Sequence, residues 1–151
     1  MIEIKYLAPE IFLVISIFFL LSVGVYLKNS FNIIFRLSTI TILATLLILL
    51  SSDIENIKIF KDSIIIDDFS LFIKSLILIS SFFILIMSKK YLNDIKNDKF
   101  EYPIIILFSI LGMFIMVGSN DLIVFYLGLE LQSLSLYILA SIDRDNSKSS
   151  E

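Results

Sequence analysis

The chain has 151 residues and a formal net charge of −3, and 58% of its residues are hydrophobic, with a mean hydropathy of +0.95. Soluble domains are roughly 45–50% apolar, and the long apolar runs of this chain exclude a soluble enzyme or a nucleic-acid-binding protein. The absence of Cys and His excludes disulfides, thiolate metal sites and the usual general base of neutral pH. The sequence therefore predicts an all-α membrane protein in which any proton chemistry uses carboxylates, lysine, tyrosine or water.

The first fifty residues predict two membrane spans. Leu7–Leu27 is an apolar run of about 21 residues, which at 1.5 Å per residue matches a hydrocarbon core of roughly 30 Å. A polar break over 28–31 precedes the second span, Ile33–Leu50, in which Arg36 lies one turn inside and is interpreted as an interfacial anchor. The charged residues before and at the start of the first run are interpreted as its polar flank: Glu3, Lys5 and Glu10.

The polar segment 51–68 predicts a small β-hairpin. The strings NIKIF and SIIID are rich in β-branched residues and lie on either side of Lys61 and Asp62. No Gly is present at the turn, although Gly is the residue most typical of tight hairpin turns. We expect the hairpin to lie on the membrane surface between the second and third spans.

The third span is predicted over Phe69–Ser88, and Lys74 lies on its second turn. Two interpretations of Lys74 stay open: a lysine that extends to the membrane surface, or a buried lysine that helps to set the charge state of a carboxylate. The following stretch, KKYLNDIKNDKFE, is interpreted as a solvated loop or a short surface helix without chemistry of its own.

The last apolar stretch, Pro103–Ile142, has about 40 residues and is twice as long as one bilayer crossing requires. Its only break is the string GSND over 118–121, where Gly can end one helix and Asn or Asp can cap the next. We therefore expect a tight helical hairpin with spans over 103–118 and 121–141, so the fold is expected to be a single membrane domain with about five transmembrane helices.

Five spans place the termini on opposite sides of the membrane. One side carries eight basic residues: Lys28, Arg36, Lys89, Lys90, Lys96, Lys99, Arg144 and Lys148. The other side carries three, with Lys74 inside the third span: Lys5, Lys58 and Lys61. By the positive-inside rule, the N-terminus is predicted to face outward and the C-terminus to face the cytoplasm or matrix.

Glu130 lies in the middle of the fifth span, about 13.5 Å along a helix from Asp121. An acidic residue at the centre of a membrane helix costs roughly 2.5 to 3.5 kcal/mol, so such a residue suggests a functional site. Further polar side chains follow the helical spacing of a single face with Glu130, and we interpret them as a polar stripe: Tyr126, Ser133, Tyr137 and Ser141. This stripe is expected to face other helices or water rather than lipid.

Two roles for Glu130 follow from its burial in a membrane helix. Desolvation favours the neutral form of a carboxyl group and a nearby lysine ammonium favours the charged form, so a moving lysine could switch its charge and drive a proton relay. Alternatively, a protonated Glu130 could hold helices together by hydrogen bonds to Ser or Tyr. Gln132 and Ser135 lie off the stripe and are interpreted as packing residues.

The string DLIVFYLGLELQSLSLYILA over 121–140 resembles the N-terminal part of subunit 2 of NADH:ubiquinone oxidoreductase, respiratory complex I. Two further stretches agree with this family: APE at the start of the first span, and IIIDDFSLFIKSLILISS leading into the third. The string ELQSLSLY is specific, because sister subunits 4 and 5 and the related sodium/proton antiporter subunits surround their glutamate with different residues. The resemblance runs through essentially all 151 residues.

The resemblance implies an antiporter-like fold, in which a glutamate on the fifth helix pairs with a lysine on a broken seventh helix. Glu130 matches this glutamate, and Lys74 matches a lysine that is common in mitochondrial members. Members of the family continue for many more helices, so the lysine of the broken helix is expected on a second polypeptide that begins near helix six, with a truncated chain as the alternative. The resemblance also implies other membrane-arm subunits and membrane lipids as partners, and places FMN, iron–sulfur clusters and ubiquinone elsewhere in the complex.

The expected function is proton relay through Glu130 in the membrane arm of a complex that oxidises NADH and reduces ubiquinone, without bond chemistry in this chain. A subunit of a cation/proton antiporter and a structural remnant of the membrane arm are the alternatives. The resemblance implies the mitochondrial inner membrane or a bacterial plasma membrane as the location. A residue usage with abundant Phe, Asn, Ser and Lys and little Gly is typical of AT-rich organelle genomes.

Overall fold

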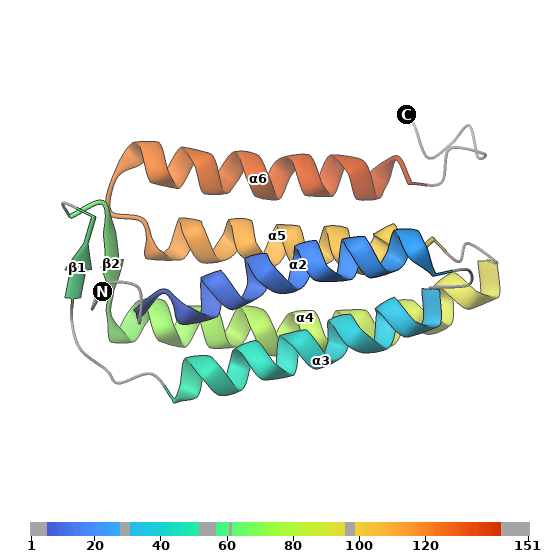
Figure 1. The fold of residues 1–151 in the computed structure, drawn as a ribbon. Coiled ribbons are helices and arrows are strands. Elements are labelled where there is room, and N and C mark those ends of the chain that lie inside the picture. The colour runs from blue at the N-terminus through green and yellow to red at the C-terminus, as the bar shows by residue number, and fades with distance from the viewer. Residues whose placement is uncertain (1–5, 28–30, 52–56, 61, 96–98, 143–151) are drawn as a thin grey trace.

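The computed structural model describes residues 6–27, 31–51, 57–60, 62–95 and 99–142. Within these ranges five long helices lie side by side in a bundle (Figure 1): α2 (Ala8–Tyr26), α3 (Phe31–Leu50), α4 (Asp68–Ile95), α5 (Glu101–Gly118) and α6 (Leu122–Ala140). Each of these helices is long and apolar enough to cross a membrane. The predicted all-α membrane fold is therefore confirmed.

One helix differs from its predicted extent by more than two residues. α4 begins at Asp68 and continues to Ile95, about two turns beyond the end predicted at Ser88. The predicted loop or short surface helix is thus, over 89–95, a continuation of the membrane helix. Lysine and leucine are good helix formers, so a helix need not end where it becomes polar, and the backbone hydrogen bonds of α4 continue past the apolar part.

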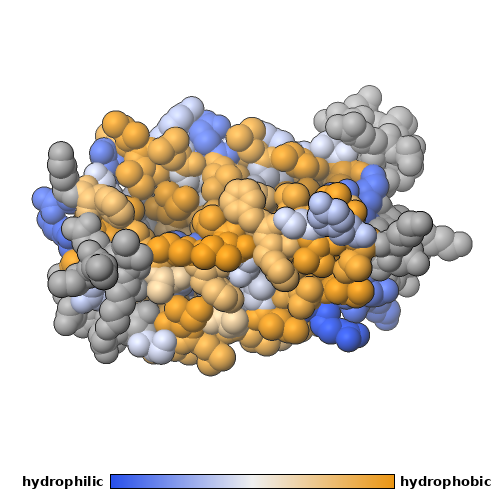
Figure 2. All heavy atoms as spheres, viewed as in Figure 1, coloured by the Kyte–Doolittle hydropathy of each residue, from blue (hydrophilic) through white to orange (hydrophobic). Residues whose placement is uncertain are grey.

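The core is centred on α5, which packs against α2, α3, α4 and α6. α5 is the most buried of the five helices and α6 is the least buried, since α6 packs chiefly against α5. The outer surface is mostly apolar along the length of the bundle, and hydrophilic residues gather toward its two ends (Figure 2). This distribution is the one expected of a bundle whose middle lies in hydrocarbon.

A two-stranded antiparallel hairpin covers one end of the bundle, which we call the hairpin end (Figure 1). β1 (Ile57–Ile59) pairs with β2 (Ile64–Ile66), so that Ile59 lies opposite Ile64. The predicted hairpin is confirmed. Its turn has no Gly, and the positive φ angles that Gly usually adopts in such turns are adopted by Phe60, at 54°, and Asp62, at 68°.

The hairpin is fastened to the turn between α5 and α6. The Asn120 backbone N–H donates to the Ser63 carbonyl at 2.9 Å, and the Asn120 side-chain amide donates to the Asp62 carbonyl at 2.7 Å. Asp121 caps α6 by accepting a hydrogen bond from the Ile123 backbone N–H at 3.3 Å. The break predicted over 118–121 is thus the place where α5 ends and α6 begins.

Several residues of the charge count lie outside the described residues: Lys5, Lys28, Lys61, Lys96, Arg144 and Lys148. Most of the polar break at 28–31 and the central residue of the hairpin turn lie outside them as well. α2 begins at the hairpin end, whereas α6 ends at the opposite end of the bundle (Figure 1).

Candidate functional site

The position of α6 is set by a close contact with α5. A Cβ atom added to Gly128 would lie 2.8 Å from the Met116 backbone nitrogen, and one added to Gly112 would lie 2.7 Å from the Gln132 backbone nitrogen. Two helix backbones approach this closely only where both lack side chains, which is a frequent device in membrane helix pairs. Because Gly128 is two residues before Glu130, this contact fixes which face of α6 carries the carboxylate.

The polar stripe faces away from this contact. Glu130 is half-buried, while Tyr126 and Tyr137 are 58% and 69% exposed. The Tyr126 hydroxyl interacts with the Glu130 carboxylate one turn away on the same helix. The structure therefore brings together Tyr126 and Glu130 on an outer face of α6 that no other described helix covers.

The serines of the stripe bond to the helix backbone and not to the carboxylate. Ser133 Oγ donates to the Glu130 backbone carbonyl at 3.1 Å, and Ser141 Oγ donates to the Ile138 carbonyl at the same distance. Serine hydroxyls within helices often donate to a backbone carbonyl of the preceding turn in this way. Among the described residues, Glu130 is thus only partly buried in spite of its mid-span position.

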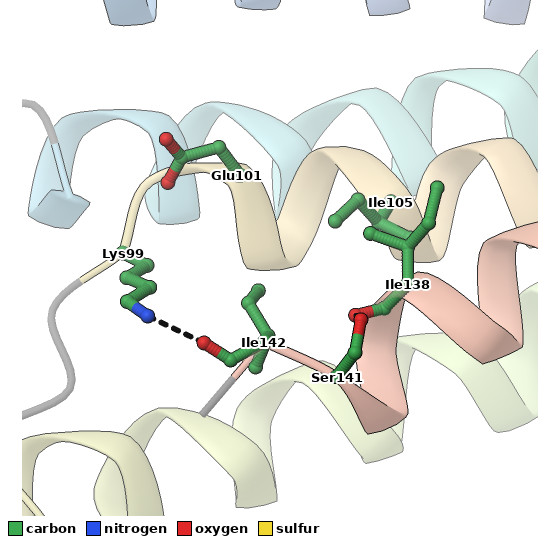
Figure 3. A pocket seen from close by; sticks show the side chains of 6 residues that line it. All are labelled: Lys99, Glu101, Ile105, Ile138, Ser141 and Ile142. Atoms are coloured by element: carbon green, nitrogen blue, oxygen red, sulfur yellow. Dashed lines mark hydrogen bonds between the residues drawn. The ribbon is translucent and has the colours of Figure 1, made fainter. Parts of the chain in front are cut away.

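Ser141 lines a cavity of about 370 Å³ at the end of the bundle opposite the hairpin (Figure 3). Lys99 and Glu101 lie on the α5 side of this cavity, and the Lys99 ammonium donates to the Ile142 carbonyl just past α6. That bond satisfies a carbonyl that the end of the helix leaves free. The far end of the stripe therefore lies beside two charged side chains.

A second cavity, of about 300 Å³, lies between α4, α5 and α6. Four polar side chains line it among apolar ones: Ser81, Tyr102, Ser109 and Gln132. Gln132 therefore faces the interior of the bundle, on the side of α6 away from Glu130, as does the buried Ser135, whose hydroxyl donates to the Leu131 carbonyl at 2.7 Å.

Lys74 is buried, with only 2% of its surface exposed, and its ammonium donates to Glu10 Oε1 at 2.6 Å. The ammonium also lies 5.7 Å from the centroid of the Phe114 ring on α5. Of the two interpretations of Lys74, the structure has the buried lysine that faces a carboxylate. That carboxylate belongs to Glu10 on α2, so Glu130 on α6 does not take this role within the chain.

Sequence reasoning missed Glu10 because it treated this residue as part of the polar flank. The residue lies in the first turn of α2, directly after Pro9, and its Oε2 atom is buried without a hydrogen-bond partner among the described residues. An unpaired buried polar group costs about 1–3 kcal/mol. The sequence did contain a signal for this pair, because an acid, Glu10, lies inside the first predicted span and a lysine, Lys74, lies inside the third.

The described residues contain no group of three or more carboxylates that could hold a metal ion. Ionisable groups meet at two separate points of the described bundle, Glu130 with Tyr126 and Glu10 with Lys74.

Comparison with known proteins decides the family. Subunit N of NADH-quinone oxidoreductase from Pelagibacter ubique is 47% identical over 150 residues, which cover 99% of this chain and 32% of that protein. The chain is a homologue of NADH-quinone oxidoreductase subunit N. Subunit N from Paramagnetospirillum magneticum is 40% identical over 95% of the chain, and that from Bartonella bacilliformis is 39% identical over 99%.

The chain spans about a third of the length of these subunit N relatives. No family model matches the chain. The relatives are bacterial, and the five apolar helices among the described residues indicate a multi-pass membrane protein.

Proposed function

We propose that this chain takes part in proton translocation as the N-terminal part of a subunit N, with Glu130 as its relay carboxylate. The observation that carries the proposal is a carboxylate near the middle of a membrane helix, held by the Gly112–Gly128 contact on the outer face of α6 and accompanied by the Tyr126 hydroxyl. An ionisable group at this depth is expensive unless it faces protein or water. The complex, by the printed name of the relatives, oxidises NADH and reduces a quinone.

We further propose that helices equivalent to the remaining two thirds of the relatives cover the exposed face of α6. Tyr126 and Tyr137 are largely exposed on that face, and Glu130 is half-buried there. Hydroxyl and carboxyl groups at membrane depth require partners from other helices or from water. The family resemblance implies that the partner of Glu130 is a lysine on a helix that breaks within the membrane.

The test is to change Glu130 to Gln in the complex assembled with this chain and to measure NADH oxidation together with proton uptake into proteoliposomes. Positioned proton-transfer groups contribute roughly 10²- to 10⁴-fold, so proton-coupled turnover should fall at least about tenfold. Asp68→Asn is the matched control, because Asp68 is an exposed acid at the start of α4. Unchanged proton transport in a normally assembled Glu130→Gln complex would refute the relay.

The same preparation separates the alternatives. A subunit of a cation/proton antiporter would sit in an assembly that exchanges cations for protons without oxidising NADH. A structural remnant of the membrane arm would leave proton transport unchanged in Glu130→Gln while its deletion prevents assembly. The 47% identity to a subunit of an NADH-quinone oxidoreductase supports a place in that complex over a place in a separate antiporter.

The proposed location is an energy-converting membrane, either the mitochondrial inner membrane or a bacterial plasma membrane, with the hairpin end facing outward. The chain has no Cys, so single cysteines report sidedness cleanly. Phe60→Cys on the hairpin should react with a membrane-impermeant maleimide from outside, and Lys90→Cys on α4 should react only after the membrane is opened. The opposite pattern would reverse the proposed orientation.

A further inference from the structure

We propose that Glu10 and Lys74 form a second proton-exchanging site of this chain, separate from Glu130. In this site Oε2 of Glu10 takes up and releases one proton, while Oε1 stays bonded to Lys74. On loading, an O–H bond forms at Oε2 and one O–H bond of a hydronium ion breaks to leave water, and release reverses both changes. The pair then alternates between net charges of zero and plus one. The inference rests on the proposed function, because it requires that protons move through this chain.

Three helices enclose the site. α2 supplies Glu10, and α4 supplies Lys74, whose Nζ lies 2.6 Å from Oε1. α5 supplies the Phe114 ring, 5.7 Å from Nζ, and Gly118, where an added Cβ would lie 3.4 Å from Nζ. The α5 residues and the β2 residues next to Gly118 do not titrate, so the acid and the ammonium are the only ionisable groups among these contacts.

The unpaired Oε2 atom of Glu10 is the feature that distinguishes a proton-exchanging site from an ion pair that only holds helices together. Oε2 of Glu10 is buried and lacks a hydrogen-bond partner among the described residues, although buried polar atoms in proteins are almost always paired. Buried ion pairs add little stability over apolar residues of similar size. Packing of α2 against α4 alone therefore does not explain why this position holds an ion pair. The free Oε2 can accept a proton while Oε1 keeps its bond to Lys74, and the ammonium beside it favours the later release of that proton.

The site also lies close to the surface of the hairpin end. Glu10 is in the first turn of α2, and Lys74 is six residues into α4, which corresponds to roughly 9 Å from the start of that helix. β2 covers Gly118, since Ile64 Cγ2 lies 3.6 Å and the Ile65 carbonyl oxygen 3.7 Å from the position of an added Cβ. A proton therefore travels about two helical turns between the site and the membrane surface, beside the hairpin.

The first experiment changes both partners, Glu10→Gln with Lys74→Met, in the complex assembled with this chain. The double variant removes both charges and leaves no lone buried ion, so the bundle should assemble. Proton-coupled NADH oxidation in proteoliposomes should fall roughly tenfold or more, as expected for the loss of a proton-transfer group. The matched control pair is Asp68→Asn with Lys58→Met, which removes one exposed acid and one exposed lysine at the same end.

The second experiment follows the carboxyl group directly and does not depend on the double variant. Infrared difference spectra of the wild-type complex between high and low pH should contain a C=O band of a protonated carboxyl group that shifts in heavy water. Glu10→Gln should remove this band, and Glu10→Asp should move it while restoring part of the proton transport. If Glu10 only packs helices together, the spectra of the wild-type and Glu10→Gln complexes should be the same in this region.

The outcomes distinguish this inference from the proposed function. If Glu130→Gln impairs proton transport and the Glu10/Lys74 double variant does not, the second site is refuted and the relay stands. If the double variant is impaired and Glu130→Gln is not, the second site stands and the role of Glu130 is refuted. Normal transport in both refutes both. Impairment in both, together with an infrared band that Glu10→Gln removes, supports both.

Discussion

Two acids in membrane helices of this chain have opposite surroundings. Glu10 is enclosed near the hairpin end, where the Lys74 ammonium bonds to one of its oxygens. Glu130 lies on the outer face of the least buried helix and interacts with Tyr126 on the same helix. Among the described residues, the first acid thus has a charged partner on another helix, whereas the second interacts with a side chain of its own helix. Stability measurements on the chain should therefore respond to the first pair much more than to the second.

Lys74→Met should produce the largest loss of stability. It leaves Glu10, whose side chain is 13% exposed, without its ammonium, and breaking a buried ion pair on one side costs about 3–5 kcal/mol. The measurement is the free energy of unfolding of the full chain in detergent micelles. Lys58→Met, at an exposed position of β1, serves as the control. Equal stability of the two variants would contradict a buried ion pair between Lys74 and Glu10.

Gly128→Ala should have the next largest effect, because it tests the contact that orients α6. The added methyl group would lie 2.8 Å from a backbone nitrogen of α5 and 2.9 Å from the Gly112 carbonyl oxygen, neither of which can rotate away. Overpacking of this kind costs about 1–3 kcal/mol. The comparison variant is Gly24→Ala, whose methyl group would meet the movable Phe100 side chain. A greater loss in Gly24→Ala, by the same unfolding measurement, would contradict this account.

Asp121→Ala should destabilise the chain by about 1 kcal/mol, the usual value for loss of a helix cap. The Asp121 carboxylate accepts a hydrogen bond from the Ile123 backbone N–H, and alanine offers no acceptor. Asp121→Asn retains an acceptor and should recover most of the loss in the same denaturation assay. An equal loss in both variants would show that charge, and not the cap, matters at this position.

Glu130→Gln should have the smallest effect on stability, within about 0.5 kcal/mol, as is typical of substitutions that remove no enclosed partner. The carboxylate is half-buried on a face that the other described helices leave open. A loss as large as that of Lys74→Met would show that Glu130 has a partner inside this chain. The same substitution should still lower proton transport in the assembled complex.

The helices and the hairpin could be predicted because their signals are local. Apolar runs of bilayer length, the GSND break and the two strings around Lys61 each lie within a short stretch of sequence. The end of α4 was placed too early because the prediction followed the apolar pattern, and a helix that leaves the membrane needs no apolar residues to continue to Ile95.

The site could be predicted only in part because its contacts join distant residues. Spacing along one helix predicted that Tyr126 and Glu130 share a face, and they interact. The pairing of Glu10 with Lys74 spans 64 residues and depends on how α2 packs against the rest of the bundle. No periodicity within a single helix contains that information. The bonds from Ser133 and Ser141 to the backbone also depend on whether water or a partner competes for the hydroxyl groups.

The helical hairpin of α5 and α6 is fixed at both ends and in the middle. Asn120 joins its turn to the β-hairpin, the glycine contact holds the centre, and Lys99 bonds to the carbonyl of Ile142 at the far end. Such a pair of helices cannot slide or rotate internally without breaking one of these three connections. A helix that covered this face, as proposed above, would therefore meet Tyr126, Glu130 and Tyr137 at constant heights. Any change of distance at Glu130 would then have to come from movement of that helix.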